Sequence, residues 1–242
     1  MKPRAIDLFC GAGGMSMGLH RAGWDVTGVD IQPFNAQPSL FAGADPIDRY
    51  PFRFIEADAL TVDLTGYDLI CASPPCQRYS AATRQSGNPE RHPDLIGPIR
   101  ERLKASGALW CIENVVGAPL IDPVMLCGTM FGLRVVRHRL FESSFHIDTP
   151  HHEHRGSLVD GDYVTVAGSG GVPAWTYKQR EAAGRPRYMP GEMSLETWRA
   201  AMGIDWMSRE RLVQAIPPAY GEHVGRAAMA ALELRCTRAA AC

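Results

Sequence analysis

The sequence predicts an α/β fold in which helices cover both faces of a mainly parallel sheet. Short apolar stretches alternate with stretches of helical periodicity through the first two-thirds of the chain, and glycine or proline turns separate them. Repeated strand–helix–strand units of this kind build parallel sheets. Such sheets bind ligands beyond the carboxyl ends of their strands. The predicted strands end at or near Cys10, Asp30, Asp58, Cys76 and Glu113.

The elements follow from the apolar pattern in chain order. Strands are predicted at residues 5–9, 24–29, 52–56, 69–73 and 109–112. A helix should follow the first glycine turn and reach residue 22, and residues 95–105 repeat apolar positions at helical spacing. Alternating arginines at residues 137–139 indicate a further strand. Three helices should close the chain at residues 194–202, 208–216 and 220–235.

The pattern breaks between residues 145 and 190, which predicts three regions. Residues 1–144 should form the catalytic and cofactor-binding core, 145–190 a small insert with a strand near 163–167, and 191–242 a group of helices that returns to the core. The insert contains His151, His152 and His154. We expect them to lie in a polar loop without a metal, because no cysteine is close to them in the sequence.

The composition limits the classes of protein to which this chain can belong. The 242 residues carry 25 Lys and Arg against 26 Asp and Glu, so nucleic-acid binding would need local basic patches. We expect no secretory signal and no membrane span, since no apolar run approaches the roughly 20 residues that a bilayer requires. Seven scattered cysteines suggest a reducing, cytoplasmic location. We further expect a monomer.

Two sets of strand-end residues suggest a bound ligand. The turn from Cys10 to Gly14 allows a ligand to approach the backbone, and the following helix N-terminus favours a negatively charged group. Asp30 suits ribose hydroxyls, and Asp58 could accept a hydrogen bond from an adenine amino group. For either acid alone, a solvated turn residue is the simpler interpretation. Together, and in this order, they indicate a cofactor that contains a nucleoside.

The segment from Ser73 to Gln77 indicates a nucleophile. Two prolines stiffen the backbone directly before Cys76, and rigid placement suits covalent catalysis. The alternative is a small buried cysteine. The polar loop that follows, to His92, contains basic residues that could touch phosphates.

Two further sets of strand residues could serve chemistry or structure. Glu113 follows an apolar strand, where a carboxyl group can have a raised pKa and donate a proton, although it could equally be an exposed strand-end acid. Arg137 and Arg139, taken alone, fit a salt-bridged edge strand.

Together these motifs resemble the DNA (cytosine-5) methyltransferase family, and the compact form resembles small phage-encoded members. The resemblance covers residues 5–144 and 197–230. Its implied fold is the Rossmann-like S-adenosylmethionine-dependent methyltransferase fold with a small target-recognition insert. Three positions depart from the family pattern: Asp30 replaces the usual Glu, Val135 the usual Gln before the arginine pair, and Gln214 stands where Gly-Asn is usual. These departures concern the cofactor pocket and the base clamp.

The resemblance implies roles for individual residues. Cys76 would attack C6 of a flipped cytosine, Glu113 would act at N3 and the exocyclic amine, and Arg139 would hold O2 with support from Arg137. S-adenosylmethionine would be held by Phe9, Gly11, Gly13, Asp30, Ile31, Asp58, Ala59 and Pro75. Double-stranded DNA would be contacted by Gln77, Arg78, Ser80, Arg84, Lys178, Arg180, Arg185 and Arg187. An RNA cytosine-5 methyltransferase and a catalytically silent DNA-binding relative are the alternatives.

Overall fold

The computed structural model describes residues 2–32, 50–80, 88–166, 174–186, 191–192 and 194–240. Its centre is a seven-stranded sheet of order β3-β2-β1-β4-β5-β7-β6. The five parallel strands are β1 (Arg4–Leu8), β2 (Asp25–Asp30), β3 (Arg53–Glu56), β4 (Leu69–Ala72) and β5 (Leu109–Asn114). Strand β7 (Arg139–Ser143) runs antiparallel between β5 and β6 (Val124–Leu126). The predicted α/β class is confirmed.

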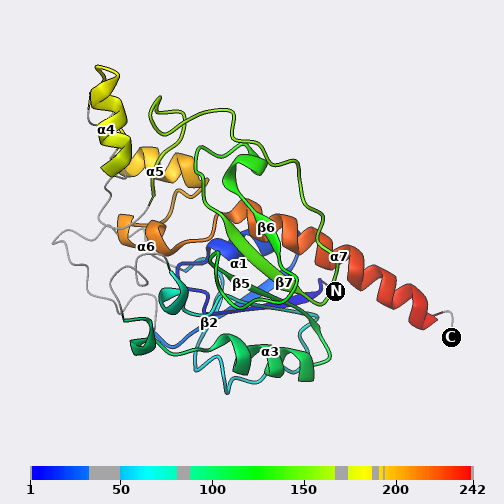
Figure 1. Cartoon of the computed structure of the whole chain (residues 1–242). Coiled ribbons are helices and arrows are strands. Elements are labelled where there is room, and N and C mark those ends of the chain that lie inside the picture. The colour runs from blue at the N-terminus through cyan, green and yellow to red at the C-terminus, as the bar shows by residue number, and fades with distance from the viewer. Residues whose placement is uncertain are drawn as a thin grey trace.

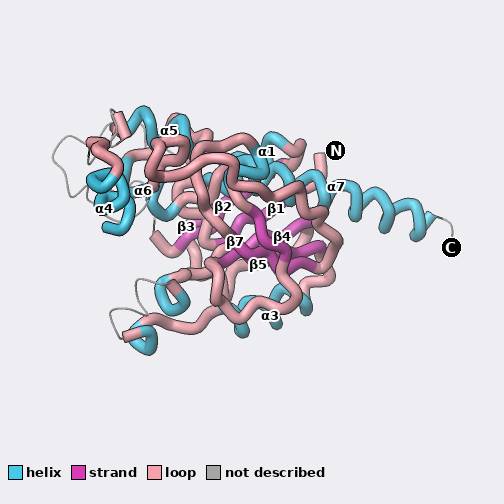
Figure 2. The backbone as a smooth tube through the Cα atoms, turned by 45° about the horizontal axis from the view of Figure 1, so that its top comes forward, coloured by secondary structure: helices cyan, strands magenta, loops and turns pink. Residues whose placement is uncertain are grey.

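Helices cover both faces of the sheet, as Figure 2 shows, with α3 (Ile96–Ala105) on one side and α1 (Gly14–Arg21) and α7 (Pro218–Ala240) on the other. Alternation along each strand divides the core between the two sides. Ala5 and Leu69 face the cluster that includes residues of α1 and α7, whereas Ile6 and Ile70 face α3. All four residues are completely buried, as expected for the central strands of a parallel sheet.

Glycines bring α1 and α7 unusually close. A Cβ atom at Gly18 would lie 2.2 Å from the carbonyl oxygen of Pro218, and one at Gly221 would lie 2.5 Å from that of Met15. A Cβ atom at Gly14 would lie 2.1 Å from the carbonyl oxygen of Ile216. The C-terminal part of the chain therefore packs directly onto the first helix, beside the turn that follows β1.

A third apolar cluster joins the core to α5 (Leu195–Met202) and α6 (Arg209–Gln214). Trp198 and Met202 lie at its centre and are fully buried. Helix α4 (Ala174–Ala182) lies beyond α5, as Figure 1 shows. Among the described residues, the helices include none that is both long and apolar enough to cross a membrane.

Three details differ from the sequence-based expectations. The strand predicted near residues 163–167 is absent from 163–166, where one backbone hydrogen bond, Val164 N to Arg134 O at 2.7 Å, replaces a ladder. Strand β7 begins at Arg139, so Arg137 precedes it. Helix α7 is longer than predicted at both ends and begins at Pro218, a residue that suits a first helical turn.

Candidate active site

A cavity of about 590 Å³ lies at the carboxyl ends of the parallel strands. The register explains why strand-end residues meet there, because Leu8 pairs with both Val29 and Ala72, and Ala72 pairs with Ile112. Many residues proposed from the sequence line it: Phe9, Gly11, Asp30, Ile31, Asp58, Ala59, Pro75, Cys76, Gln77, Glu113 and Arg139.

The turn after β1 is held open by left-handed backbone conformations. Phe9, Gly11 and Gly13 have φ values of 60°, 48° and 82°. A positive φ is uncommon at a phenylalanine and marks local strain of the kind found at ligand sites. Gly13 does not line the cavity, and a Cβ atom there would lie 2.9 Å from the Tyr50 ring. Its role is therefore to end the turn and begin α1, for which it is the N-cap.

The two acids predicted to bind a nucleoside both lie at the cavity. Asp30 Oδ2 accepts a hydrogen bond from Gly11 N at 3.0 Å, and Oδ1 accepts one from Gln32 N at 3.2 Å. Asp58 Oδ1 accepts one from Leu60 N at 2.8 Å. Asp30 thus fixes the glycine turn from the neighbouring strand, and Asp58 organises the turn after β3.

Cys76 sits at the end of a constrained segment. Asn114 Nδ2 donates to Pro74 O at 2.9 Å, which ties the segment after β4 to the end of β5. Cys76 is half-buried, lines the cavity and precedes the short 3₁₀ helix Gln77–Tyr79. Asn114 is buried and directly follows Glu113 in the chain. The link therefore fixes the segment that carries the Cys76 thiol relative to Glu113.

Glu113 and Arg139 form an ion pair in the cavity wall. Arg139 Nε lies 2.9 Å from Glu113 Oε1, and both side chains are largely buried. The N–H direction is poor, so Oε1 has no aligned hydrogen-bond partner among the described residues. Burial raises the pKa of Glu113, while Arg139 and Arg137 act in the opposite direction. A raised pKa makes a carboxyl group a better proton donor than one exposed to solvent.

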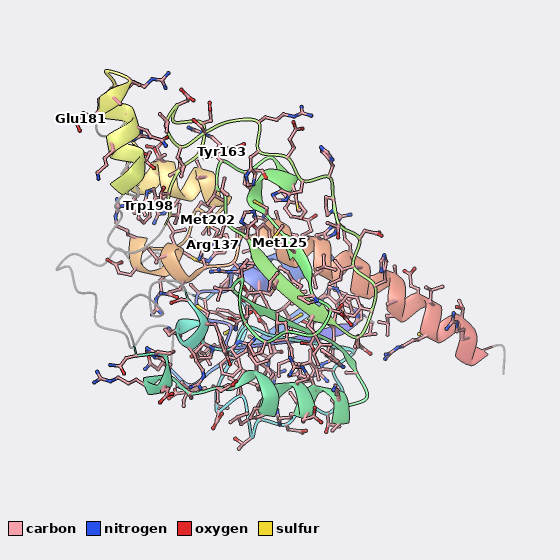
Figure 3. The ribbon with its side chains drawn as sticks, viewed as in Figure 1. Met125, Arg137, Tyr163, Glu181, Trp198 and Met202 are labelled. Carbon is pink, nitrogen blue, oxygen red and sulfur yellow. The ribbon has the colours of Figure 1, made fainter. Side chains whose placement is uncertain are left out.

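Arg137 does not line the cavity, and its predicted role in support of Arg139 stays a prediction. Its guanidinium donates to Val166 O at 3.0 Å and to Val213 O at 2.6 Å, and so links the approach to β7 with α6. Figure 3 shows Arg137 between the β6–β7 strand pair and helices α5 and α6. Burial lowers the pKa of Arg137 to about 9, so the group stays cationic at neutral pH. It is a positioning residue.

The predicted DNA contacts are distributed unevenly. Gln77 is exposed at the cavity, and Arg78 is half-buried and donates to His92 O at 2.9 Å. Ser80 is half-buried and directly follows the 3₁₀ helix Gln77–Tyr79. Lys178 is exposed on α4. The predicted contacts Arg84 and Arg187 lie outside the described residues.

Arg180 is buried, and its predicted DNA contact is therefore wrong. The side chain has no exposed surface and pairs with Glu192 Oε2 at 2.7 Å and Oε1 at 3.1 Å. It also donates to the carbonyl oxygens of Leu158 and Val159. Arg185 is exposed but forms an ion pair with Asp160. These two arginines hold the 145–190 region together, because each one links α4 or its end to residues 158–160.

Sequence reasoning missed a buried polar group beneath the cavity. Asp7 is completely buried in β1, lines the cavity and accepts a hydrogen bond from Ser16 Oγ, which in turn accepts one from Tyr50 OH at 2.7 Å. Asp7 Oδ1 has no hydrogen-bond partner among the described residues. Burial raises the pKa of Asp7 to about 7. The sequence did contain a signal for this buried group, because Asp7 is an acid inside an otherwise apolar strand.

The C-terminal helices supply the remaining wall. Arg211, Gln214, Ala215 and Ile216 line the cavity, and Trp206 Nε1 donates to Ala12 O at 3.0 Å. Segments about 200 residues apart thus enclose one site. In the sequence, this arrangement was indicated by the expectation that the helices of residues 191–242 return to the core.

Comparisons with known proteins agree with this geometry. Residues 3–118 match the family model of the C-5 cytosine-specific DNA methylases. Type II methyltransferase M.NgoMIV of Neisseria gonorrhoeae is 29% identical over 127 residues, which cover 51% of this chain and 38% of that protein. M.XorII of Xanthomonas oryzae is 28% identical over 130 residues, which cover 48% of this chain and 29% of that protein. The matched part of the chain thus spans about a third of these relatives.

The fold likeness extends further than the sequence match. A crystal structure of a candidate DNA modification methyltransferase encoded within an E. coli prophage aligns with a TM-score of 0.58 at 13% identity. The alignment covers 96% of this chain and 99% of that one. The predicted Rossmann-like methyltransferase fold is confirmed. The similarity to the C-5 cytosine-specific DNA methylases lies in residues 3–118, which are just under half of the chain.

Proposed function

We propose that this protein transfers a methyl group from S-adenosylmethionine to C5 of a cytosine in double-stranded DNA, through a covalent adduct with Cys76. The observation that carries the proposal is the convergence of Cys76, Glu113 and Arg139 on one cavity. The same cavity holds the glycine turn, Asp30 and Asp58, so a nucleoside cofactor and a reacting base would meet within it.

The residues at the glycine turn suit S-adenosylmethionine. The cavity volume of about 590 Å³ is that of a small-molecule site. No side chain caps α1, and Gly14 and Met15 of its first turn line the cavity, which favours a carboxylate there. Ile31 is 68% exposed at the cavity and offers an apolar surface to a ring. When bound, the cofactor supplies an electrophilic methyl group.

The chain's own residues would make the cytosine ring reactive. The thiolate of Cys76 forms a bond to C6, which ends the aromaticity of the ring and gives C5 the character of an enamine. Glu113 protonates N3 or hydrogen-bonds to it, so that negative charge does not build up on the ring. C5 takes the methyl group, then loses its proton, and the bond from C6 to sulfur breaks. The product is 5-methylcytosine, and the thiolate is restored.

Arg139 would serve both Glu113 and the base. In the described structure it pairs with Glu113 at 2.9 Å. A base in the cavity would offer O2 as an additional acceptor, while the cation keeps the carboxyl group near the point of proton exchange. C5 and C6 lie inside a duplex, so the cytosine must be flipped out, at a cost of a few kcal/mol.

The test is a methyl-transfer assay with a labelled cofactor on DNA and RNA duplexes of matched sequence. Label in DNA, but not in RNA, is the expected result. Label in RNA alone would support the RNA methyltransferase alternative. A folded protein that labels neither substrate would support a silent relative.

A further inference from the structure

We propose that Cys127, His138, His152 and His154 form a structural zinc site outside the cavity. The sulfur atom and one nitrogen of each histidine all lie within 4.8 Å of one another. The three histidines come from regions where the sequence predicted only a polar loop and an edge strand. The cysteine that their chemistry requires is distant in the sequence but adjacent in space.

The spacing of the ligand atoms fits a tetrahedral ion. Zinc bonds of about 2.0–2.1 Å to nitrogen and about 2.3 Å to sulfur place neighbouring ligand atoms about 3.3–3.6 Å apart. Cys127 Sγ lies 3.5 Å from His154 Nε2, and His138 Nε2 lies 3.4 Å from His152 Nε2. The two nitrogens of His152 and His154 are 2.9 Å apart and the remaining pairs lie within 4.8 Å, so the side chains must shift slightly to reach a regular tetrahedron.

Two ligands are positioned by the sheet. Leu126 of β6 pairs with Arg139 of β7, and Cys127 and His138 are the residues directly beyond this end of the antiparallel ladder. Cys127 is completely buried, and Thr129 Oγ1 donates to its sulfur at 3.4 Å. A hydrogen bond of this kind is typical of the surroundings of a metal ligand, which it orients. Half of the site is therefore preorganised by the core.

The other two ligands come from an irregular segment. His152 and His154 are two residues apart in the chain, and their Nε2 atoms lie 2.9 Å apart. His151 points elsewhere and lies 3.5 Å from Glu153, which also pairs with Arg155 at 2.8 Å. The alternation separates a face of ligands from a face of exposed charges. His151 is therefore a matched control for the ligand histidines.

The ligand set favours zinc and a structural role. Nitrogen and thiolate ligands in a tetrahedron select zinc over magnesium or calcium, and four protein ligands leave no open position for catalysis. The ion would fasten the irregular segment around residues 150–157 to the β6–β7 pair. His138 is flanked by Arg137 and Arg139, so the same ion would brace the arginine that pairs with Glu113.

The first experiment measures zinc in the untagged chain by mass spectrometry, after purification and dialysis against metal-free buffer. We expect about one zinc per chain in the parent and in His151→Ala. Cys127→Ser and His154→Ala should lose at least about nine-tenths of it. His154 is exposed, so its removal leaves the core intact. Equal zinc contents in the parent and both ligand variants would overturn the proposal.

A second experiment tests the geometry directly. Chelator-stripped protein is titrated with Co²⁺, whose intense visible bands report a tetrahedral site and whose near-ultraviolet band reports a thiolate ligand. Saturation at one equivalent, with loss of the thiolate band in Cys127→Ser, is expected. Thr129→Val should weaken the metal affinity roughly 10–100-fold. Absence of a saturable tetrahedral spectrum in the folded parent would show that the four side chains only share protons. Neither readout depends on methyl transfer.

Discussion

At the scale of single residues, burial decides which side chains can do chemistry. Glu113 and Asp7 are both buried carboxyl groups at one cavity, and burial raises the pKa of each. They differ in their partners. Glu113 faces a guanidinium, whereas Asp7 is hydrogen-bonded by Ser16 and has one oxygen without a partner among the described residues. Glu113 is thus suited to proton exchange, and Asp7 adds a pH-dependent cost to the fold.

Asp7 predicts how stability depends on pH. Its pKa rises from 3.8 to about 7 on folding, so the folded state binds more protons than the unfolded state between those values. Stability should therefore fall as the pH rises from about 4 to 7, by at most about 4 kcal/mol from this group. Asp7→Asn should remove much of that fall. Urea unfolding of the parent and of Asp7→Asn at pH 5 and pH 8 measures this effect. If the two proteins differ in free energy of unfolding by the same amount at both pH values, the assignment is contradicted.

Asp58 should affect the cofactor rather than DNA. It lines the cavity close to Ala59, and its Oδ1 accepts a hydrogen bond from Leu60 N. Asp58→Ala should weaken S-adenosylmethionine binding by roughly 0.5–1.5 kcal/mol. Calorimetry with each ligand provides the measurement. Equal weakening of DNA and cofactor binding would show that the residue is wrongly assigned.

At the scale of elements, two close contacts organise the site. Glycines let α7 lie against α1, so that the segment before α7 completes the cavity wall. Within the insert of residues 145–190, Arg180 of α4 binds Glu192 and the carbonyl oxygens of Leu158 and Val159, and so holds its helix in place. In both cases a sequence feature that suggests ligand binding or flexibility has a packing role as well.

The α1–α7 contact predicts contrasting effects of two alanine substitutions. Gly18→Ala should destabilise the protein by roughly 1–3 kcal/mol or more, because the new Cβ atom would lie 2.2 Å from Pro218 O. Gly97→Ala in α3 is the control, since nothing lies within 4 Å of its Cβ position. It should be neutral or stabilising by up to about 1 kcal/mol. Chemical denaturation compares the two, and similar effects would contradict the close contact.

Two basic residues of α4 should separate structure from DNA binding. Arg180→Ala leaves Glu192 buried without its cation and should cost roughly 3–5 kcal/mol of stability. Lys178→Ala changes an exposed residue, so stability should stay constant. If Lys178 contacts phosphate, the salt dependence of DNA binding should fall by about one counterion. Chemical denaturation measures the stability of both variants, and salt titration measures the salt dependence of their DNA binding. A stable Arg180→Ala variant would refute the buried pair.

At the scale of the whole molecule, local patterns predicted the sheet and most of the cavity. Cys76, Glu113 and Asp30 lie at or beyond the ends of strands whose apolar runs are visible in the sequence, and parallel register brings strand ends together. Contacts between distant segments could not be predicted in this way. Arg180 and Lys178 share a helix and a charge, yet only tertiary packing decides that one is buried. Cys127 likewise meets His154, 27 residues away in the chain, only through tertiary packing.

The central claim is that Cys76 forms a covalent bond to the target base. The most direct test incubates the protein and S-adenosylmethionine with DNA that carries 5-fluorocytosine. Fluorine cannot leave C5 as a cation, so the bond from sulfur to C6 cannot break after methyl transfer. We predict an adduct that survives denaturing electrophoresis for the parent and is absent from Cys76→Ala. No adduct in a parent that methylates ordinary DNA, or an unchanged adduct in Cys76→Ala, would contradict the account.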